Sequence, residues 1–212
     1  MVLTLTKEHA RVFRITHRDN VSWILDNGMH AQSGEVSDPN FRNIGNPELI
    51  ERRTHRVIEI QPGGTLSDYI PFYFTPFSIM MFNIRTGRSV KQVPDEDIVI
   101  FVSSLPHMAS CGVHFLFTNQ HAYTEGADFY ATPDKLEEID RALLQARDFK
   151  RDPDDPGKLS RYMAEALVWR HVPLNALQGV CCYSPVVERQ LKAEVASRRL
   201  SFNVAVQRNW YF

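Results

Sequence analysis

Short segments with the side-chain pattern of β-strands recur along the whole chain, and helical segments separate them at irregular intervals. Residues 11–16 alternate polar and apolar side chains, and residues 97–105 form the most apolar run. Such segments are more numerous than a repeated βαβ unit requires. We therefore predict one α+β domain over residues 1–212, built on a central, bent, largely antiparallel sheet flanked by helices.

Further strands are expected at residues 55–60, 112–120, 178–185 and 202–207. Residues 69–77 contain Pro71 and Pro76, which favours an irregular or edge strand. Helices are expected at residues 21–28, 47–53, 134–149, 158–177 and 185–198. Asp19 or Asn20 is expected to cap the first of them, and Gly28 to end it.

Composition and missing motifs narrow the possible functions. The net charge of −1 places any nucleic-acid binding in a local basic groove. Three cysteines without a CxxC pair fit a reducing cytoplasmic location, and no apolar run approaches the ~18 residues of a membrane span. The GxGxxG, GxxxxGK[ST], HExxH and GxSxG motifs are absent. A nucleotide, if one binds, must be held in another way.

Two polar stretches could bind a ligand. His17 and Asn20 lie where a predicted strand meets a predicted helix and can hydrogen-bond a ligand there, or they serve as a turn residue and a helix cap. Arg52, Arg53 and Arg56 are close in sequence, and guanidinium groups match the paired oxygens of phosphates. The alternative is a solvated helix end.

Two further stretches are aromatic or acidic. Residues 68–83 are rich in aromatic side chains that could stack on a base or a nicotinamide ring, or could form core. Glu165 lies between Ala164 and Ala166 within the predicted helix 158–177. The small neighbours leave room for a ligand beside its carboxylate, although most helical glutamates are exposed surface charges.

Taken in order, six segments resemble the DarT family of bacterial DNA ADP-ribosyltransferase toxins. They are ITHRDNVSWILDNG, FRNIGNPELIERR, PGGTLSDYIPFYFTPFSIMMF, FLFTNQHA, YMAEALVWRHVPL and the terminal NWYF. The resemblance implies an ADP-ribosyltransferase-like fold whose split sheet grips NAD+ as co-substrate, without a metal. It implies transfer to a base in single-stranded DNA, thymidine or, in a sister branch, guanosine. It also implies a macrodomain or related glycohydrolase antitoxin as partner.

The resemblance also implies roles for individual residues. Glu165 matches the catalytic glutamate, and Arg53, rather than Arg52, matches the functional arginine. His121 matches the start of the substrate-facing loop. The residues expected to contact NAD+ are Thr16, His17, Asn20, Arg53, Tyr73 and Met80. Phe77 and Ile79 depart from the PRSPM pattern frequent in the family, which leaves the preferred base open.

DNA contacts are expected in residues 122–161, where basic side chains are interleaved with aromatic ones, including Phe149. His121, Lys150, Arg151 and Arg161 are the predicted DNA-binding residues. Acidic residues are also frequent there, so a mixed-charge surface explains the composition equally well. Other functions that fit the sequence are ADP-ribosylation of RNA or protein, NAD+ hydrolysis, and a non-catalytic nucleic-acid-binding module.

Overall fold

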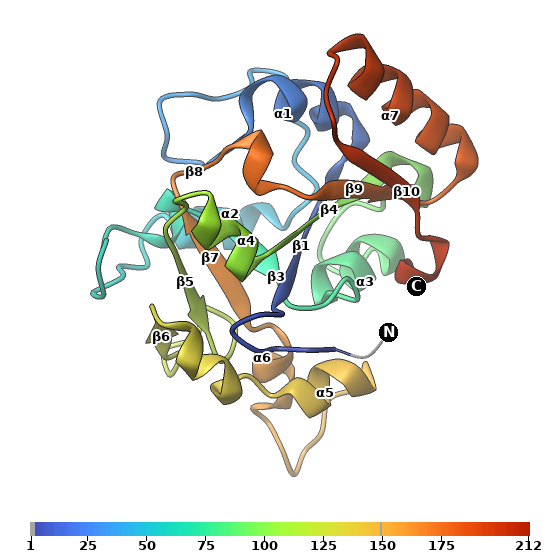
Figure 1. The fold of residues 1–212 in the computed structure, drawn as a ribbon. Helices are drawn as coiled ribbons and strands as arrows, with labels where there is room; N and C mark the ends of the chain where they lie inside the picture. Colours follow the sequence, from blue (N-terminus) through green and yellow to red (C-terminus); the bar gives the residue numbers. More distant parts are fainter. Residues whose placement is uncertain (1–2, 149) are drawn as a thin grey trace.

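The computed structural model describes residues 3–148 and 150–212, so Phe149 lies outside the described residues. Its centre is an eight-stranded sheet in the order β10-β9-β4-β1-β3-β7-β5-β6, and a two-stranded sheet pairs β2 (Met29–His30) with β8 (His171–Val172) (Figure 1). The central strands are β1 (Arg11–His17), β3 (Tyr69–Tyr73), β4 (Ile98–Ser104), β5 (Phe115–Thr118), β6 (Phe129–Tyr130), β7 (Glu165–Trp169), β9 (Gly179–Cys182) and β10 (Asn203–Val206). Only β9 and β10 pair in parallel among these described strands. The predicted largely antiparallel α+β fold is confirmed.

The sheet is split between β1 and β3. Strand β1 pairs with β4 along its whole length, but with β3 only at Phe13 and Tyr73. Beyond this pair the two strands diverge. The Pro71 carbonyl accepts a hydrogen bond from Arg14 Nη1 at 3.0 Å, across the gap. The backbone N and C=O of one strand residue point to the same side, so the nitrogen of Pro71 also faces the gap. On that side no described strand pairs with β3 at this position, and the missing N–H of proline therefore costs no backbone hydrogen bond.

Helices cover the two ends of the sheet. Figure 1 shows α1 (Val21–Asn27) and α7 (Pro185–Ser197) at the upper end, with α5 (Arg141–Ala146) and α6 (Lys158–Tyr162) at the lower end. The remaining α-helices are α2 (Pro47–Arg53), α3 (Ile79–Thr86) and α4 (Leu105–Ser110). In α7, Val187, Leu191 and Val195 are buried at four-residue steps, which is the spacing of one helical face. Most predicted strands and helices are confirmed within a few residues.

The predicted helix 158–177 is wrong. Helix α6 ends at Tyr162, and strand β7 begins at Glu165. This strand lies between β3 and β5, and Ala166, Leu167 and Val168 are fully buried. A strand buried on both faces is a continuous apolar run, which side-chain periodicity cannot distinguish from a buried helix.

Three other predictions fail for local reasons. The helix expected at 134–149 is a 3₁₀ segment (Pro133–Glu138) followed by α5, because the Asp140 side chain accepts the Leu143 N–H and starts a new helix. The strand expected at 55–60 is a loop with one bridge between Val57 and Thr65. Residues 69–73 form a central strand rather than an edge strand, because Pro71 faces the split.

Candidate active site

The carboxylate of Glu165 is buried at the first residue of β7, where its side chain is 2% exposed. Its Oε2 accepts a hydrogen bond from Arg53 Nη1 at 3.1 Å. Its Oε1 accepts one from the Ala122 N–H at 3.1 Å, and His121 Nε2 lies 3.6 Å from the same oxygen. A buried charge needs such partners, and here they come from α2 and from the turn after β5.

These partners fix the ionisation of the site. Burial by itself raises the pKa of Glu165, but Arg53, His121 and the Ala122 N–H together hold it below its ordinary value. Burial lowers the pKa of His121, against the opposing effect of Glu165. At neutral pH the site therefore holds a carboxylate beside an uncharged imidazole.

Arg53 and Arg52 are neighbours in very different surroundings. Arg53 ends α2, is 9% exposed, and its Nη2 is buried without a hydrogen-bond partner among the described residues. Arg52 is exposed and forms an ion pair with Glu48 on the same helix. A buried, unpaired guanidinium nitrogen is costly, so Arg53 Nη2 is available for an oxygen of a ligand.

A cavity of about 400 Å³ follows the split between β1 and β3, within the usual size range of ligand sites. Strand β1 contributes Arg14 and Thr16, β3 contributes Pro71 and Tyr73, and α2 contributes Arg53. Six of the predicted site residues line this cavity. They are Thr16, Arg53, Tyr73, Met80, His121 and Glu165.

Tyr73 and Met80 join β3 to α3 beside the cavity. The Tyr73 hydroxyl donates to Met80 Sδ at 3.4 Å, and burial raises the pKa of Tyr73 to about 12, so this hydroxyl keeps its proton. Ser78 caps α3 by accepting the Met81 N–H, and this fixes the start of the helix that carries Met80.

His17 and Asn20 do not line the cavity; they lie behind Thr16, which does. The Asn20 side chain makes no helix-capping bond. It donates to Thr16 Oγ1 at 2.8 Å and to the Arg42 carbonyl at 2.9 Å, and it accepts the Arg42 N–H at 2.8 Å. The predicted Asn20 cap is therefore wrong, because the loop at Arg42 takes its hydrogen bonds. His17 Nδ1 accepts the Asp19 N–H, and burial lowers the pKa of His17.

Arg14 is a cavity residue that the sequence reasoning missed. It lies two positions before Thr16 on β1 and therefore on the same face of the strand. Burial lowers the pKa of Arg14, but an arginine keeps its charge in proteins. Arg14 and Arg53 thus bring two guanidinium groups to the cavity that the Glu165 carboxylate lines. The two-residue step from Thr16 is the signal that could have identified Arg14.

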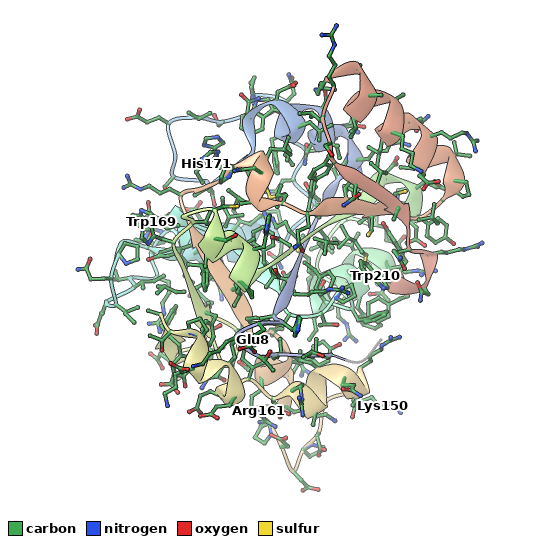
Figure 2. All side chains as sticks on the ribbon, viewed as in Figure 1. Glu8, Lys150, Arg161, Trp169, His171 and Trp210 are labelled. Carbon is green, nitrogen blue, oxygen red and sulfur yellow. The ribbon has the colours of Figure 1, made fainter. Side chains whose placement is uncertain are left out.

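The basic residues predicted to bind DNA lie elsewhere. Lys150 and Arg151 are exposed, and neither they nor Arg161 line the cavity. Figure 2 places Lys150 and Arg161 at the lower end of the molecule, near α5 and α6. Arg161 forms ion pairs with Asp140 at 3.3 Å and Asp155 at 2.7 Å, as expected for a mixed-charge surface.

The described residues contain neither a metal-binding cluster nor a membrane-spanning helix. In residues 3–148 and 150–212, no group of three or more His, Cys, Asp or Glu side chains could hold a metal ion. In the same part of the chain, no helix has the length and apolar character needed to cross a membrane.

The fold, with its cavity at the split of the sheet, is shared with an ADP-ribosyltransferase solved in complex with NAD+, and the chain is an enzyme of this NAD+-using class. A family model described as "ssDNA thymidine ADP-ribosyltransferase, DarT" matches residues 13–212. The chain belongs to the DarT family, as its sequence motifs indicated.

Relatives support this membership over the full chain. A DNA ADP-ribosyl transferase of Escherichia coli O127:H6 is 49% identical over 210 residues, covering 99% of this chain and 96% of that protein. One from Thermus sp. (strain 2.9) is 32% identical over 209 residues, with 97% of each chain covered.

Solved structures agree in fold. Thermus sp. 2.9 DarT in complex with ADP-ribosylated ssDNA has a TM-score of 0.89 at 28% identity, covering 99% of both chains. The same protein in complex with NAD+ has a TM-score of 0.82 at 27% identity, covering 96% of this chain and 98% of that one. The predicted ADP-ribosyltransferase-like fold and the use of NAD+ are confirmed.

Proposed function

We propose that this chain, as one domain, transfers ADP-ribose from NAD+ to thymidine in single-stranded DNA and acts as a bacterial toxin. Guanosine is the alternative acceptor base. The observation that carries the proposal is the buried carboxylate of Glu165, held by Arg53 on a cavity at the split of the sheet. The relatives whose structures contain NAD+ or ADP-ribosylated ssDNA support the same reaction.

The cavity residues fit NAD+. The unpaired Nη2 of Arg53 suits a phosphate or hydroxyl oxygen, and Arg14 adds a second positive charge for the pyrophosphate. Tyr73 and Met80 offer an apolar surface for a flat ring. Asn20 supports this wall from behind, through Thr16 and the loop at Arg42, and His17 holds the same turn through the Asp19 N–H.

When bound, NAD+ supplies the ADP-ribosyl group as its C1′–nicotinamide bond breaks, which leaves positive charge on the ribose. Glu165 stabilises that charge from a fixed position in a partly dry cleft. Arg53 and the Ala122 N–H keep the carboxylate ionised and oriented before the substrate arrives.

The acceptor base must lose a proton as the new bond forms. The N3 nitrogen of thymine keeps its proton at neutral pH and is then a weak nucleophile. We propose that Glu165 accepts this proton once it has stabilised the ribose cation. The neutral His121 lies beside it. The unpaired nitrogen of Arg53 either holds the pyrophosphate or orients the base.

The DNA must reach the cavity as a single strand or a flipped base, because a stacked base pair cannot enter a cleft of this size. His121 lines the cavity and is the supported contact to the base. Lys150 and Arg151 are exposed cations that we propose for more distant phosphates. The two carboxylates on Arg161 make it the weakest of these candidates.

A partner and a location complete the proposal. Because the chain belongs to the DarT family, we propose as its antitoxin a macrodomain or related glycohydrolase that removes ADP-ribose from DNA. We place both in the cytoplasm, where the DNA lies. Co-expression with such a hydrolase should restore growth of cells that produce this chain, and a hydrolase with an inactivated site should not.

The reaction is tested by incubating the protein with NAD+ and oligonucleotides that differ only in containing thymidine or guanosine. Mass spectrometry should find ADP-ribose on a base of the single strand and none on the duplex. Labelling of RNA or protein instead, or nicotinamide release without an adduct, would assign a different acceptor. DNA binding without any nicotinamide release would contradict catalysis.

A further inference from the structure

Thr118 ends β5 beside the backbone of Glu165 and is fully buried. It does not line the cavity. Its Oγ1 accepts the backbone N–H of Glu165 at 3.1 Å and donates to the Gln120 carbonyl at 2.6 Å. One hydroxyl therefore joins the start of β7 to the turn that follows β5.

This link replaces a missing part of the sheet. The last ladder pair between β5 and β7 is Phe117 with Ala166. The next position, Thr118 beside Glu165, is joined by the threonine side chain instead. The chain can then turn away from β7 after Thr118 while the backbone of Glu165 remains hydrogen-bonded.

The turn held by Thr118 supplies two groups to the carboxylate. Gln120, whose carbonyl the hydroxyl binds, precedes His121 and Ala122. The Ala122 N–H donates to Glu165 Oε1, and His121 Nε2 lies 3.6 Å from that oxygen. The same hydroxyl thus fixes the backbone of Glu165 and the turn that carries two of the neighbours of its carboxylate.

We infer that Thr118 is a positioning residue for the transfer reaction: it sets the distance between the Glu165 carboxylate and the Ala122 N–H without touching the substrate. The inference rests on the proposed function of Glu165. A catalytic charge must be held closely in place, because a displacement of about 1 Å can cost on the order of 100-fold in rate.

The matched variants are Thr118→Val, which keeps the shape and removes the hydroxyl, and Thr118→Ser, which restores it. Ser103→Ala is the control, because Ser103 lies on β4, is equally buried and outside the cavity, and its hydroxyl donates to the Ala176 carbonyl. All three lose packing or a buried hydrogen bond. Only Thr118→Val removes a hydrogen bond that holds the turn beside Glu165.

We expect Thr118→Val to lower kcat about 10- to 100-fold and to leave KM for NAD+ within about threefold. Thr118→Ser and Ser103→Ala should stay within about threefold of the wild-type kcat. A Thr118→Val enzyme that is folded and has the wild-type kcat would overturn the inference. So would a loss of kcat that Thr118→Ser shares.

A second measurement does not depend on turnover. The groups facing the carboxylate are Arg53, His121, Tyr73 and Arg14, and none of them is altered in these variants. Because the Ala122 N–H lowers the pKa of Glu165, loss of that bond should raise it.

The carboxyl ¹³C signal of labelled Glu165, assigned by its loss in Glu165→Gln, reports this pKa directly. It should titrate at higher pH in Thr118→Val than in the wild type or Thr118→Ser. An unchanged titration in Thr118→Val would overturn the inference. If the wild type modifies no DNA, the proposed function fails while this titration still tests Thr118.

Discussion

Tyr73 and Glu165 are ladder partners on β3 and β7, and Tyr73 is also the residue at which β3 separates from β1. The carboxylate therefore stands at the point where the sheet opens. A ligand in the cavity has a strand on either side, and the carboxylate beside it belongs to the first residue of a central strand.

Glu165→Gln should abolish transfer while NAD+ still binds. The amide keeps the size of the side chain but removes the charge that stabilises the ribose cation, and loss of one such charge costs about 10²- to 10³-fold or more. Nicotinamide release and isothermal titration with NAD+ measure the two effects. Glu48→Gln, which alters an exposed partner of Arg52, is the control and should be fully active. Wild-type turnover in Glu165→Gln would remove Glu165 from the mechanism.

Arg53→Met should destabilise the fold as well as inactivate the enzyme. Removing one partner of a buried ion pair leaves the other charge uncompensated, which costs about 3–5 kcal/mol. Arg52→Met, at an exposed site on the same helix, should change stability by less than about 0.5 kcal/mol. Urea unfolding measures both.

The double variant Arg53→Met/Glu165→Gln provides a cross-check. It should recover part of the stability lost in Arg53→Met, because no charge is then left buried. If the double variant is less stable than Arg53→Met, the buried charge does not explain the loss.

Stability should fall as the pH decreases below about 6.5. Burial lowers the pKa of His17 and His121 from the ordinary value of 6.5, so below that value the unfolded chain binds protons that the folded chain does not. Glu165 acts at lower pH: its lowered pKa gives stability above the ordinary value of 4.5, which is lost as the pH falls through the folded value. Urea unfolding across this range should show a smaller slope near pH 6 in His121→Asn. An unchanged slope would contradict the assigned neutral imidazole.

Arg14→Met should weaken NAD+ binding about tenfold or more, since a hydrogen bond to a charged group contributes about 1.5–3 kcal/mol. Arg14→Lys keeps the charge and should lose less. Arg11→Met is the control, because Arg11 lies on the same strand but is exposed and outside this cavity. Equal NAD+ affinities in Arg14→Met and Arg11→Met would exclude Arg14 from the binding site.

Elements with a local signal could be predicted from the sequence. Helix α7 has a clear apolar face and a Ser184 cap, and β4 is a buried run. Strand β7 could not be distinguished from a helix, because its burial depends on β3 and β5 on either side of it.

The site was predictable only in part. Glu165 and Arg53 were identified by family motifs, but their contact joins residues 112 positions apart, and no local pattern encodes it. The Ala122 donor is a backbone N–H, which almost every residue type has, so the residue at this position does not reveal it. Asparagine is a common helix cap, so the residue type of Asn20 predicts a cap. Its hydrogen bonds to the Arg42 backbone depend on the tertiary fold and have no local sequence signal.

The opening beside Pro71 also determines whether β1 and β3 stay apart before a ligand binds. Two neighbouring strands normally form backbone hydrogen bonds with each other. Such pairing would compete with the binding of a ligand between them. Pro71 has no backbone N–H, and its carbonyl already accepts a hydrogen bond from Arg14. Pairing of the two strands at this position would therefore add no backbone hydrogen bond. The cavity is preorganised, so none of the binding free energy of a dinucleotide is needed to separate the strands.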